Sequence, residues 1–417
     1  MADEALHIET ALIHGAYATE EITGATVPPI FQSTSFARKS AEELESVFAG
    51  RSPGYVYSRI NNPTLDRFEH RMTALEEGLA SVSCASGMAA ISTAVLALAG
   101  SGDEVICGNS LFGGTYSLFA FTLERYGIRA RFVNATDVDA YRAAATDKTK
   151  LIFVETIGNP KLDVPNIGEI SKLAREQGIV LIVDSTVTTP VLIQPKRLGA
   201  DVVIHSTSKF INGHGNAIGG VIIDTGNFDW SGLRYPHLKP FVQRVGQFAF
   251  MAMLRNRVHR DIGGCLSPFN AFLMSIGIES LGLRMDRHCA NAVTVSEWLA
   301  SQRQIEAVRY PGLKSHPEHE TAQHQFRGRY GALLTIRLGT KKRCFQFINA
   351  LQRAQNIANL GDAKTLVIHP ASTICRDASE QERGNMGVTD DLVRMSVGIE
   401  HIDDIIADVD QALAKIN

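Results

Sequence analysis

The sequence predicts an α/β protein whose larger part is a mainly parallel sheet covered by helices. From about residue 64 to residue 225, stretches with the 3.6-residue period of amphipathic helices alternate with short, continuously apolar runs. Strands that are apolar on both faces belong in sheets that helices cover on both sides, and such sheets are mainly parallel. After about residue 262, similar patterns indicate a smaller C-terminal α/β domain.

Each element of the larger domain is assigned from its local period. Helices are expected at residues 64–77, 87–99, 115–126 and 167–177. Strands are expected at residues 104–107, 151–154, 179–183, 202–204 and 220–223. Ligands bind at the carboxyl ends of the strands in sheets of this kind, so the residues that follow these runs are candidates for chemistry.

The flanking regions complete the domain assignment. Residues 1–61 have weak periodicity and many turn formers, and we expect an N-terminal arm that packs on a neighbouring subunit. The larger domain then covers residues 62–261 and the C-terminal domain residues 262–417, and the stretch 226–265 around their boundary is less regular. Within the C-terminal domain we expect a long amphipathic stretch at 270–302, strands at 305–308, 332–338 and 392–397, and helices near 343–351 and 402–416.

The composition argues against several classes of protein. Hydrophobic residues make up 45% of the 417-residue chain and charged residues 20%, which is typical of a folded globular protein. A net charge of -3 gives no support for binding to nucleic acid or to a membrane surface. We expect no signal peptide, because the N-terminal sequence is acidic, and no membrane span, because no apolar run approaches ~20 residues.

The cysteines indicate the compartment. All 6 lie far apart in the sequence, and none forms a CxxC pair. This spacing favours neither a disulfide framework nor a metal site, so we expect reduced thiols in a cytoplasmic protein without a bound metal.

Three strand ends carry residues that suit one cofactor. Lys209 follows the apolar run 202–204, and Asp184 ends the run 179–183. A lysine can form a Schiff base with an aldehyde and a carboxylate can keep a pyridine nitrogen protonated, which are the two protein groups that pyridoxal 5'-phosphate (PLP) requires. Ser86 and Gly87 open a helix whose free N–H groups can bind a phosphate. Each residue alone has an ordinary structural explanation, but their combination favours a PLP site.

Ordered motifs then connect the chain to a family. They are Tyr57-Ser-Arg59-Ile-x-Asn-Pro63, Ser86-Gly-Met-Ala-Ala90, Glu155-Thr-Ile-Gly-Asn-Pro160, Val183-Asp184, and Ser206-x-Ser208-Lys209 with Asn212-Gly-His-Gly215. This series resembles the Cys/Met metabolism, or trans-sulfuration, group of fold-type I PLP enzymes from about residue 8 to residue 414. The resemblance implies an aspartate-aminotransferase-like fold, a PLP-binding domain at 62–261, and a homotetramer built from two catalytic dimers.

The resemblance also implies roles around the cofactor. Lys209 is the expected Schiff-base lysine and Asp184 the partner of the pyridine nitrogen, and these two act in catalysis together with Tyr57. The phosphate is expected to be held by Ser86, Gly87, Met88, Ser206 and Ser208, and by Tyr57 and Arg59 of the neighbouring subunit.

The cofactor ring and the substrate have their own expected partners. The Phe112 ring would stack on the pyridine, and Asn159 would lie near the phenolic oxygen of the cofactor. Arg394 would bind the α-carboxylate of the substrate, and Asn359 and Tyr57 complete the expected substrate-binding set.

Three further segments resemble the O-acetylhomoserine sulfhydrylase branch of this family, at residues 266–273, 359–372 and 387–400. The implied reaction is γ-replacement on O-acetyl-L-homoserine by sulfide or methanethiol, which gives homocysteine or methionine and acetate. In this reaction Lys209 removes and returns protons, and acetate leaves from Cγ before the sulfur nucleophile adds.

Two residues depart from the pattern of the relatives. Many members have tyrosine at Phe112, and its loss removes a proton donor beside the leaving group. A carboxylate leaving group, with a pKa of ~4, tolerates this loss better than a thiolate of ~8.5. Cys375 stands where relatives often have histidine, and we interpret it as a tolerated change beside the site. Methionine γ-lyases commonly have cysteine at the position of Gly114.

Other functions stay open from the sequence. Cystathionine γ-synthase or an O-succinylhomoserine sulfhydrylase would need an extra cation for the distal carboxylate of a succinyl group, and Arg255 and Arg257 are candidates. A methionine γ-lyase is less favoured. A catalytically silent PLP-binding protein is the alternative from a different class.

Overall fold

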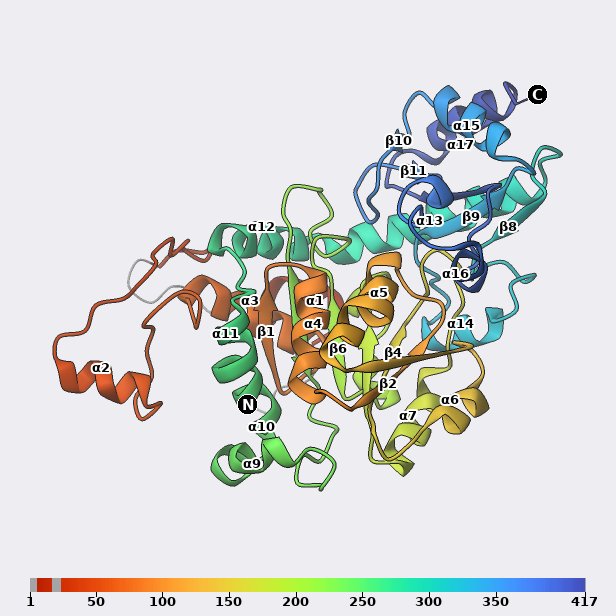
Figure 1. Cartoon of the computed structure of the whole chain (residues 1–417). Helices are drawn as coiled ribbons and strands as arrows, with labels where there is room; N and C mark the ends of the chain where they lie inside the picture. The colour runs from red at the N-terminus through yellow and green to blue at the C-terminus, as the bar shows by residue number, and fades with distance from the viewer. Residues whose placement is uncertain (1–5, 17–23, 417) are drawn as a thin grey trace.

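The computed structural model describes residues 6–16 and 24–416, and these residues form two sheets (Figure 1). The larger sheet has 7 strands in the order β1-β7-β6-β5-β4-β2-β3. The smaller sheet has 5 strands in the order β10-β11-β12-β9-β8 and lies toward the C-terminal end of the chain. The predicted fold class, a large sheet domain with a smaller C-terminal α/β domain, is confirmed.

The large sheet is mixed but mainly parallel. Its strands are β1 (Ala80–Cys84), β2 (Glu104–Gly108), β3 (Arg129–Val133), β4 (Thr149–Glu155), β5 (Val180–Asp184), β6 (Val202–His205) and β7 (Gly220–Asp224). Only β7 runs antiparallel to its neighbours, β1 and β6. The sequence analysis did not assign β1 or β3, because serines interrupt the apolar pattern of β1 and two arginines interrupt that of β3.

Helices cover both faces of this sheet. They include α3 (Pro63–Leu75), α4 (Gly87–Leu98), α6 (Val138–Ala144) and α7 (Ile167–Glu176). Successive residues of one strand enter different apolar clusters, as Ile152 and Phe153 of β4 do. Burial on both faces explains why the strand sequences are apolar without alternation.

Two helical predictions need correction. The segment predicted as one helix at 115–126 is divided into α5 (Gly113–Ser117), a π-helix η1 (Leu118–Thr122) and a 3₁₀-helix η2 (Leu123–Tyr126). The segment expected to be irregular contains α9 (Lys239–Val245), α10 (Ala249–Met253), the π-helix η6 (Leu254–His259) and α11 (Arg260–Ile262). These helices are too short to show a clear period, and Gly246 interrupts them with a positive φ of 57°.

Helices pack against the second, smaller sheet. Its strands are β8 (Ala307–Arg309), β9 (Leu333–Arg337), β10 (Gln355–Asn356), β11 (Leu366–Ile368) and β12 (Leu392–Ser396). The long amphipathic stretch predicted at 270–302 is divided at Ser280 into α12 (Pro268–Glu279) and α13 (Leu281–Ala300). Helix α13 contacts β8 and β9, and α15 (Lys341–Ala350) and α17 (Ile402–Leu413) complete the unit. The boundary at residue 262 stays a prediction.

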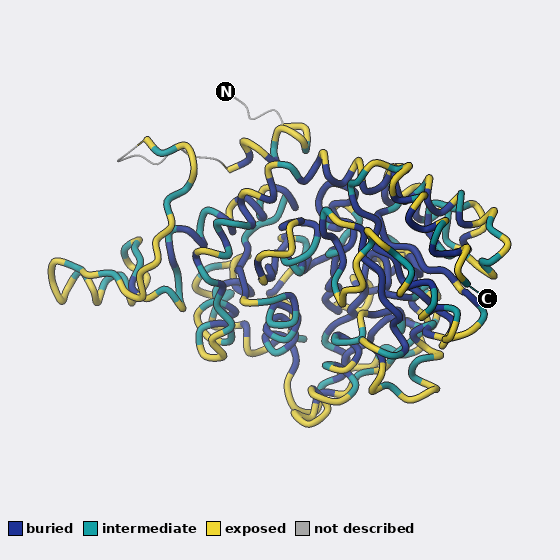
Figure 2. The backbone as a smooth tube through the Cα atoms, turned by 90° about the horizontal axis from the view of Figure 1, so that it is seen from above, coloured by how far each residue is buried: buried dark blue, intermediate teal, exposed yellow. Residues whose placement is uncertain are grey.

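The N-terminal arm has more regular structure than expected. Helix α1 (Ile8–His14) packs on α3, and α2 (Ala41–Phe48) begins at Ser40, whose side chain accepts a hydrogen bond from the N–H of Glu43. No residue of α2 is buried, and the helix lies away from the rest of the protein (Figures 1 and 2). Parts of the predicted arm, at 1–5 and 17–23, lie outside the described residues. Its packing on a neighbouring subunit stays a prediction.

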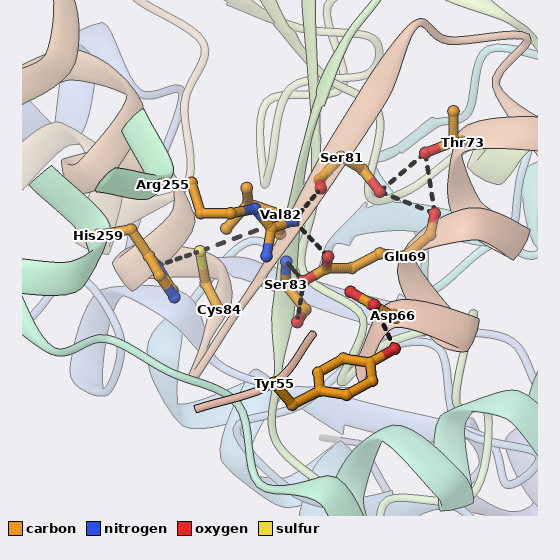
Figure 3. A network of polar contacts seen from close by, with 10 residues as sticks. All are labelled: Tyr55, Asp66, Glu69, Thr73, Ser81, Val82, Ser83, Cys84, Arg255 and His259. Carbon is orange, nitrogen blue, oxygen red and sulfur yellow. Dashed lines mark hydrogen bonds and ion pairs between the residues drawn. The ribbon is translucent and has the colours of Figure 1, made fainter. Parts of the chain in front are cut away.

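A buried polar network fixes β1, the strand that leads into α4 (Figure 3). Glu69 of α3 accepts hydrogen bonds from the N–H and hydroxyl of Ser83, at 2.8 and 2.7 Å. Arg255 of η6 donates to Glu69 at 2.5 Å and to the carbonyl oxygen of Ser81 at 2.9 Å. Because the buried carboxylate of Glu69 pairs with the partly buried guanidinium of Arg255, Arg255 belongs to this network. Among the helices of residues 6–16 and 24–416, none combines the length and apolar character that a bilayer span requires.

Gly87 allows α4 to begin directly against the end of β6. A Cβ atom at Gly87 would lie 2.6 Å from Cβ and 3.0 Å from Cα of Ser206. We expect Gly87→Ala to lower the free energy of unfolding by about 1–3 kcal/mol, because the start of the helix must move away from the strand. Urea unfolding of the apoprotein measures the change. Gly168→Ala in α7 is the control, since its nearest neighbour would be 3.6 Å away; equal losses in both variants would contradict the prediction.

Candidate active site

Strands β4, β5 and β6 end at the same edge of the large sheet, and one cavity of about 140 Å³ opens there. The side chains that line it come from both sheets. Of the residues predicted from the sequence, the cavity brings together Gly87, Met88, Phe112, Asn159, Asp184, Ser206, Lys209, Asn359 and Arg394. These residues span more than half of the chain, so the cavity exists only in the folded protein.

Lys209 follows β6 and points into this cavity. Its Nζ donates a hydrogen bond to Oδ1 of Asn359 at 2.6 Å. Burial, and then the positive charge of Arg394, lower the pKa of Lys209 to about 8. A substantial fraction of the amine is therefore neutral near physiological pH and able to act as a nucleophile or a base.

The backbone after Lys209 is held from α13. The guanidinium of Arg284 donates to the carbonyl oxygens of Phe210, at 2.6 Å, and Ile211, at 3.2 Å. Gly213 has a φ of 74°, and a Cβ there would collide with this guanidinium. The buried arginine thus fixes the turn that carries the lysine.

Two buried carboxyl groups lie side by side at the ends of neighbouring strands. Glu155 of β4 and Asp184 of β5 are register partners. Burial raises the pKa of Asp184, while burial and then the nearby Asp184 raise the pKa of Glu155 well above its usual range. Two like charges on neighbouring strand ends are unfavourable in a buried site, and both shifts favour the neutral form of the carboxyl groups. Asp184 accepts a hydrogen bond from the N–H of Thr186 at 2.9 Å.

Arg394 of β12 brings a buried cation to the cavity from the second sheet. Nη1 donates to Oδ1 of Asn159 and Nη2 to the carbonyl oxygen of Asn359, both at 2.9 Å. Its Nε has no hydrogen-bond partner among the described residues, and burial lowers its pKa to about 10. A buried guanidinium with an open donor is suited to binding a carboxylate.

The start of α4 forms the side of the cavity suited to a phosphate. The side chain of Ser86 accepts a hydrogen bond from the N–H of Ala89 at 3.0 Å as the cap of the helix. The N–H groups of Gly87 and Met88 stand in the first turn, where a helix offers no internal partner, and both residues line the cavity. Ser206 also lines the cavity.

Some predicted residues lie outside the cavity lining. The hydroxyl of Ser208 donates to the carbonyl oxygen of Gly219 at 3.2 Å and accepts from the N–H of the same residue at 3.0 Å. Ser86 is occupied as the helix cap. Tyr57 is 40% exposed, and its ring lies 5.3 Å from the guanidinium carbon of Arg59. An intersubunit role for Tyr57 and Arg59 stays a prediction.

The sequence analysis assigned no role to two polar residues of the site. Glu155 was quoted only as part of a motif, although its position directly after the predicted strand 151–154 marks it as a strand-end candidate. Thr186 gave no such signal, but its hydroxyl accepts a hydrogen bond from the N–H of Ser206 at 2.8 Å and ties the β5 end to the β6 end. Cys375 is buried against Tyr116 and Met386 beside the cavity, and Ile374 lines it.

Comparison with known proteins identifies the family. The model of the Cys/Met metabolism PLP-dependent enzymes matches residues 9–414. The chain belongs to this family. A homocysteine synthase of Schizosaccharomyces pombe is 41% identical over 99% of both chains, and an O-acetyl-L-homoserine sulfhydrylase of Leptospira meyeri is 39% identical over 98% of this chain and 97% of that one.

A solved structure supports the same relationship. An assigned O-acetylhomoserine (thiol)-lyase of Campylobacter jejuni superposes with a TM-score of 0.94 at 34% identity, covering 98% of this chain and all of that one. That structure carries a pyridoxyl-lysine phosphate group. The predicted resemblance to the Cys/Met metabolism family and its fold is confirmed.

The cavity of this family member fits PLP in its chemistry. It combines an amine with a lowered pKa, a buried carboxyl group and the start of a helix next to Gly87. These are the partners that an aldehyde, a pyridine nitrogen and a phosphate require. The protein is therefore PLP-dependent, and the roles of the individual residues remain proposals.

The lowered pKa of Lys209 is testable on the apoprotein. Only the neutral amine attacks the cofactor aldehyde, so the rate of PLP incorporation should rise with pH around a midpoint near 8. Stopped-flow absorbance between pH 6 and 11 gives this profile, and Nα-acetyl-lysine in solution provides the control for ionisations of PLP itself. A protein midpoint near 10.5, the ordinary lysine value, would contradict the prediction.

Proposed function

We propose that this protein catalyses γ-replacement on O-acetyl-L-homoserine by sulfide or methanethiol, giving homocysteine or methionine and acetate. The names of the two relatives described above support the donor and the homocysteine product. The charged residues that line the cavity support an acetyl over a succinyl donor independently of those names.

The observation that carries the proposal is the set of cations at the cavity. Among the described residues that line it, only Lys209 and Arg394 are cationic. Lys209 is committed to the cofactor and Arg394 to the α-carboxylate, and Arg59 of the neighbouring subunit is proposed to bind the phosphate. A succinyl group would therefore leave its distal carboxylate unpaired. Arg255 is bound to Glu69, and Arg257 is exposed on η6 and absent from the lining. An acetyl group has no distal charge and needs no such partner.

The residues divide the chemical work between them. Bound PLP supplies an electron sink for a carbanion formed at Cα. Arg394 binds the α-carboxylate and orients the substrate, and Asp184 holds a proton at the pyridine nitrogen. Lys209, with its lowered pKa, removes the proton from Cα and returns protons later. Phe112 would cover the cofactor ring, and Asn159, which accepts a hydrogen bond from Arg394, would lie near its phenolic oxygen.

The leaving group is consistent with the missing hydroxyl at Phe112. Acetate departs as a weak base and needs no proton donor, whereas a thiolate departs less readily without one. Tyr116, the tyrosine nearest in sequence, donates its hydroxyl to Glu382 at 3.3 Å, and it is absent from the cavity lining. The site therefore favours acyl-homoserine over a thioether such as methionine.

The assembly and compartment belong to the same proposal. We infer a homotetramer of two catalytic dimers, in which Tyr57 and Arg59 reach the phosphate of the neighbouring subunit. The exposed apolar side chains of the arm, such as Phe31 and Phe48, support an arm that packs on another chain. All 6 cysteines are free, which supports a reducing compartment, the cytoplasm.

A substrate matrix tests the reaction. Acetyl- and succinyl-homoserine are each combined with sulfide, methanethiol or cysteine, and the products are separated by chromatography. We expect acetyl-homoserine with sulfide or methanethiol to give the highest kcat/KM. Higher kcat/KM with succinyl-homoserine, or with cysteine, would replace the proposal by one of the alternatives. No product in any combination, with PLP bound, would indicate a silent binding protein.

The role of Phe112 can be tested by restoring the hydroxyl. We expect wild-type protein to eliminate methanethiol from methionine slowly, and Phe112→Tyr to raise this rate by about tenfold or more, because a proton donor is added. The rate with acetyl-homoserine should change less and serves as the control. Methionine turnover by the wild type at a rate comparable to that with acetyl-homoserine would contradict the prediction.

A further inference from the structure

We propose that Glu155 is a positioning residue that fixes Phe112 and Asn159 on the two walls of the cavity. It is buried, at 7% exposure, and lies at the end of β4 next to Asp184. The inference rests on the cofactor site of the proposed function and not on the identity of the acyl group.

The carboxyl group of Glu155 is the common acceptor for both walls. Its Oε1 accepts a hydrogen bond from the N–H of Phe112 at 2.7 Å. The backbone N–H of Asn159 donates to the same carboxyl group. Asn159 in turn accepts from Arg394, so one side chain connects the ring-covering residue to the carboxylate clamp.

Phe112 needs this support because its ring is little held by packing. Phe112 is 37% exposed, and the residues that follow it are Gly113 and Gly114. A Cβ at Gly114 would lie 2.7 Å from Cε1 of Phe112, so the ring occupies the space that a side chain there would fill. The hydrogen bond to the backbone of Phe112 and the space above Gly114 together determine where the ring lies.

The neighbouring carboxyl groups can then have different roles. In its proposed role Asp184 is ionised and holds a proton at the pyridine nitrogen. Burial and this neighbouring charge raise the pKa of Glu155 and favour its neutral form. A protonated Glu155 still accepts through one oxygen and can donate through the other. Glutamine reproduces this arrangement of acceptor and donor, whereas leucine fills a similar volume with neither.

A matched pair of variants tests the acceptor. In PLP-loaded Glu155→Gln we expect kcat/KM and the visible circular dichroism of the cofactor to stay within about threefold of wild type. In Glu155→Leu we expect kcat to fall about 10- to 100-fold and the dichroic band to change, since a shift of ~1 Å in a wall of the site has effects of this size. A Leu variant with wild-type dichroism and kcat would overturn the proposal. A Gln variant as impaired as Leu would also overturn it.

A double-mutant cycle separates positioning from a general effect on stability. If Glu155 acts partly through Phe112, the loss in the double variant Glu155→Leu/Phe112→Ala should be clearly smaller than the product of the two single losses, and the loss that remains is the effect through Asn159. Effects that multiply would show independent action and sink the idea. If Glu155→Leu does not fold, Glu155→Asp, which retracts the carboxyl group, replaces it in both tests.

Gly114→Ala provides a second route to the same ring. It leaves Glu155 intact but should displace Phe112, so we expect the dichroic band to change in the direction seen for Glu155→Leu. Succinyl-homoserine activity, if found, would refute the donor proposal but leave these spectroscopic outcomes unaffected. An unchanged band in Gly114→Ala would contradict the placement of the ring.

Discussion

The burial of ionisable groups around one cavity is the constraint on which the rest of the structure depends. Lys209, Asp184, Glu155 and Arg394 all line it, and a buried charge without a partner is strongly unfavourable. Each group therefore has a dedicated hydrogen-bond partner in the surrounding backbone or amide side chains. The same contacts that satisfy the charges also set the positions of the cavity walls, so stability and chemistry depend on the same bonds.

The two sheets contribute different parts of this arrangement. The parallel strands of the large sheet bring the lysine and the two carboxyl groups to one edge, while β12 of the small sheet brings Arg394. Arg394 bonds to Asn159 on one side and to Asn359 on the other, and Asn359 also accepts from Lys209. Asn359 therefore contacts both Lys209 and Arg394. In the proposed mechanism, this single asparagine lies between the residue that binds the substrate carboxylate and the residue that transfers protons.

Several features of this site come from side-chain atoms that are absent, such as the Cβ atoms of two glycines and a hydroxyl at Phe112. Gly87 permits the helix to start against β6, and Gly114 leaves room for the Phe112 ring. Phe112 has no hydroxyl, and the lining has no cation beyond Lys209 and Arg394 among the described residues. In the proposed reaction, these absences favour a leaving group that departs as a weak base and carries no second charge.

The sequence by itself determined the fold class, the strands with continuous apolar runs and the strand-end candidates Asp184 and Lys209, because such runs record burial on both faces of a sheet. It did not show β1 and β3, whose serines and arginines interrupt the apolar pattern. The resemblance to the family added Arg394 and Asn359. Only the tertiary structure showed that Glu155 lies beside Asp184 and that Arg255 forms an ion pair with Glu69. It also showed the short helices after residue 236. Local periodicity contains no information on which strands pair or in what register, and these choices depend on contacts between residues distant in the chain.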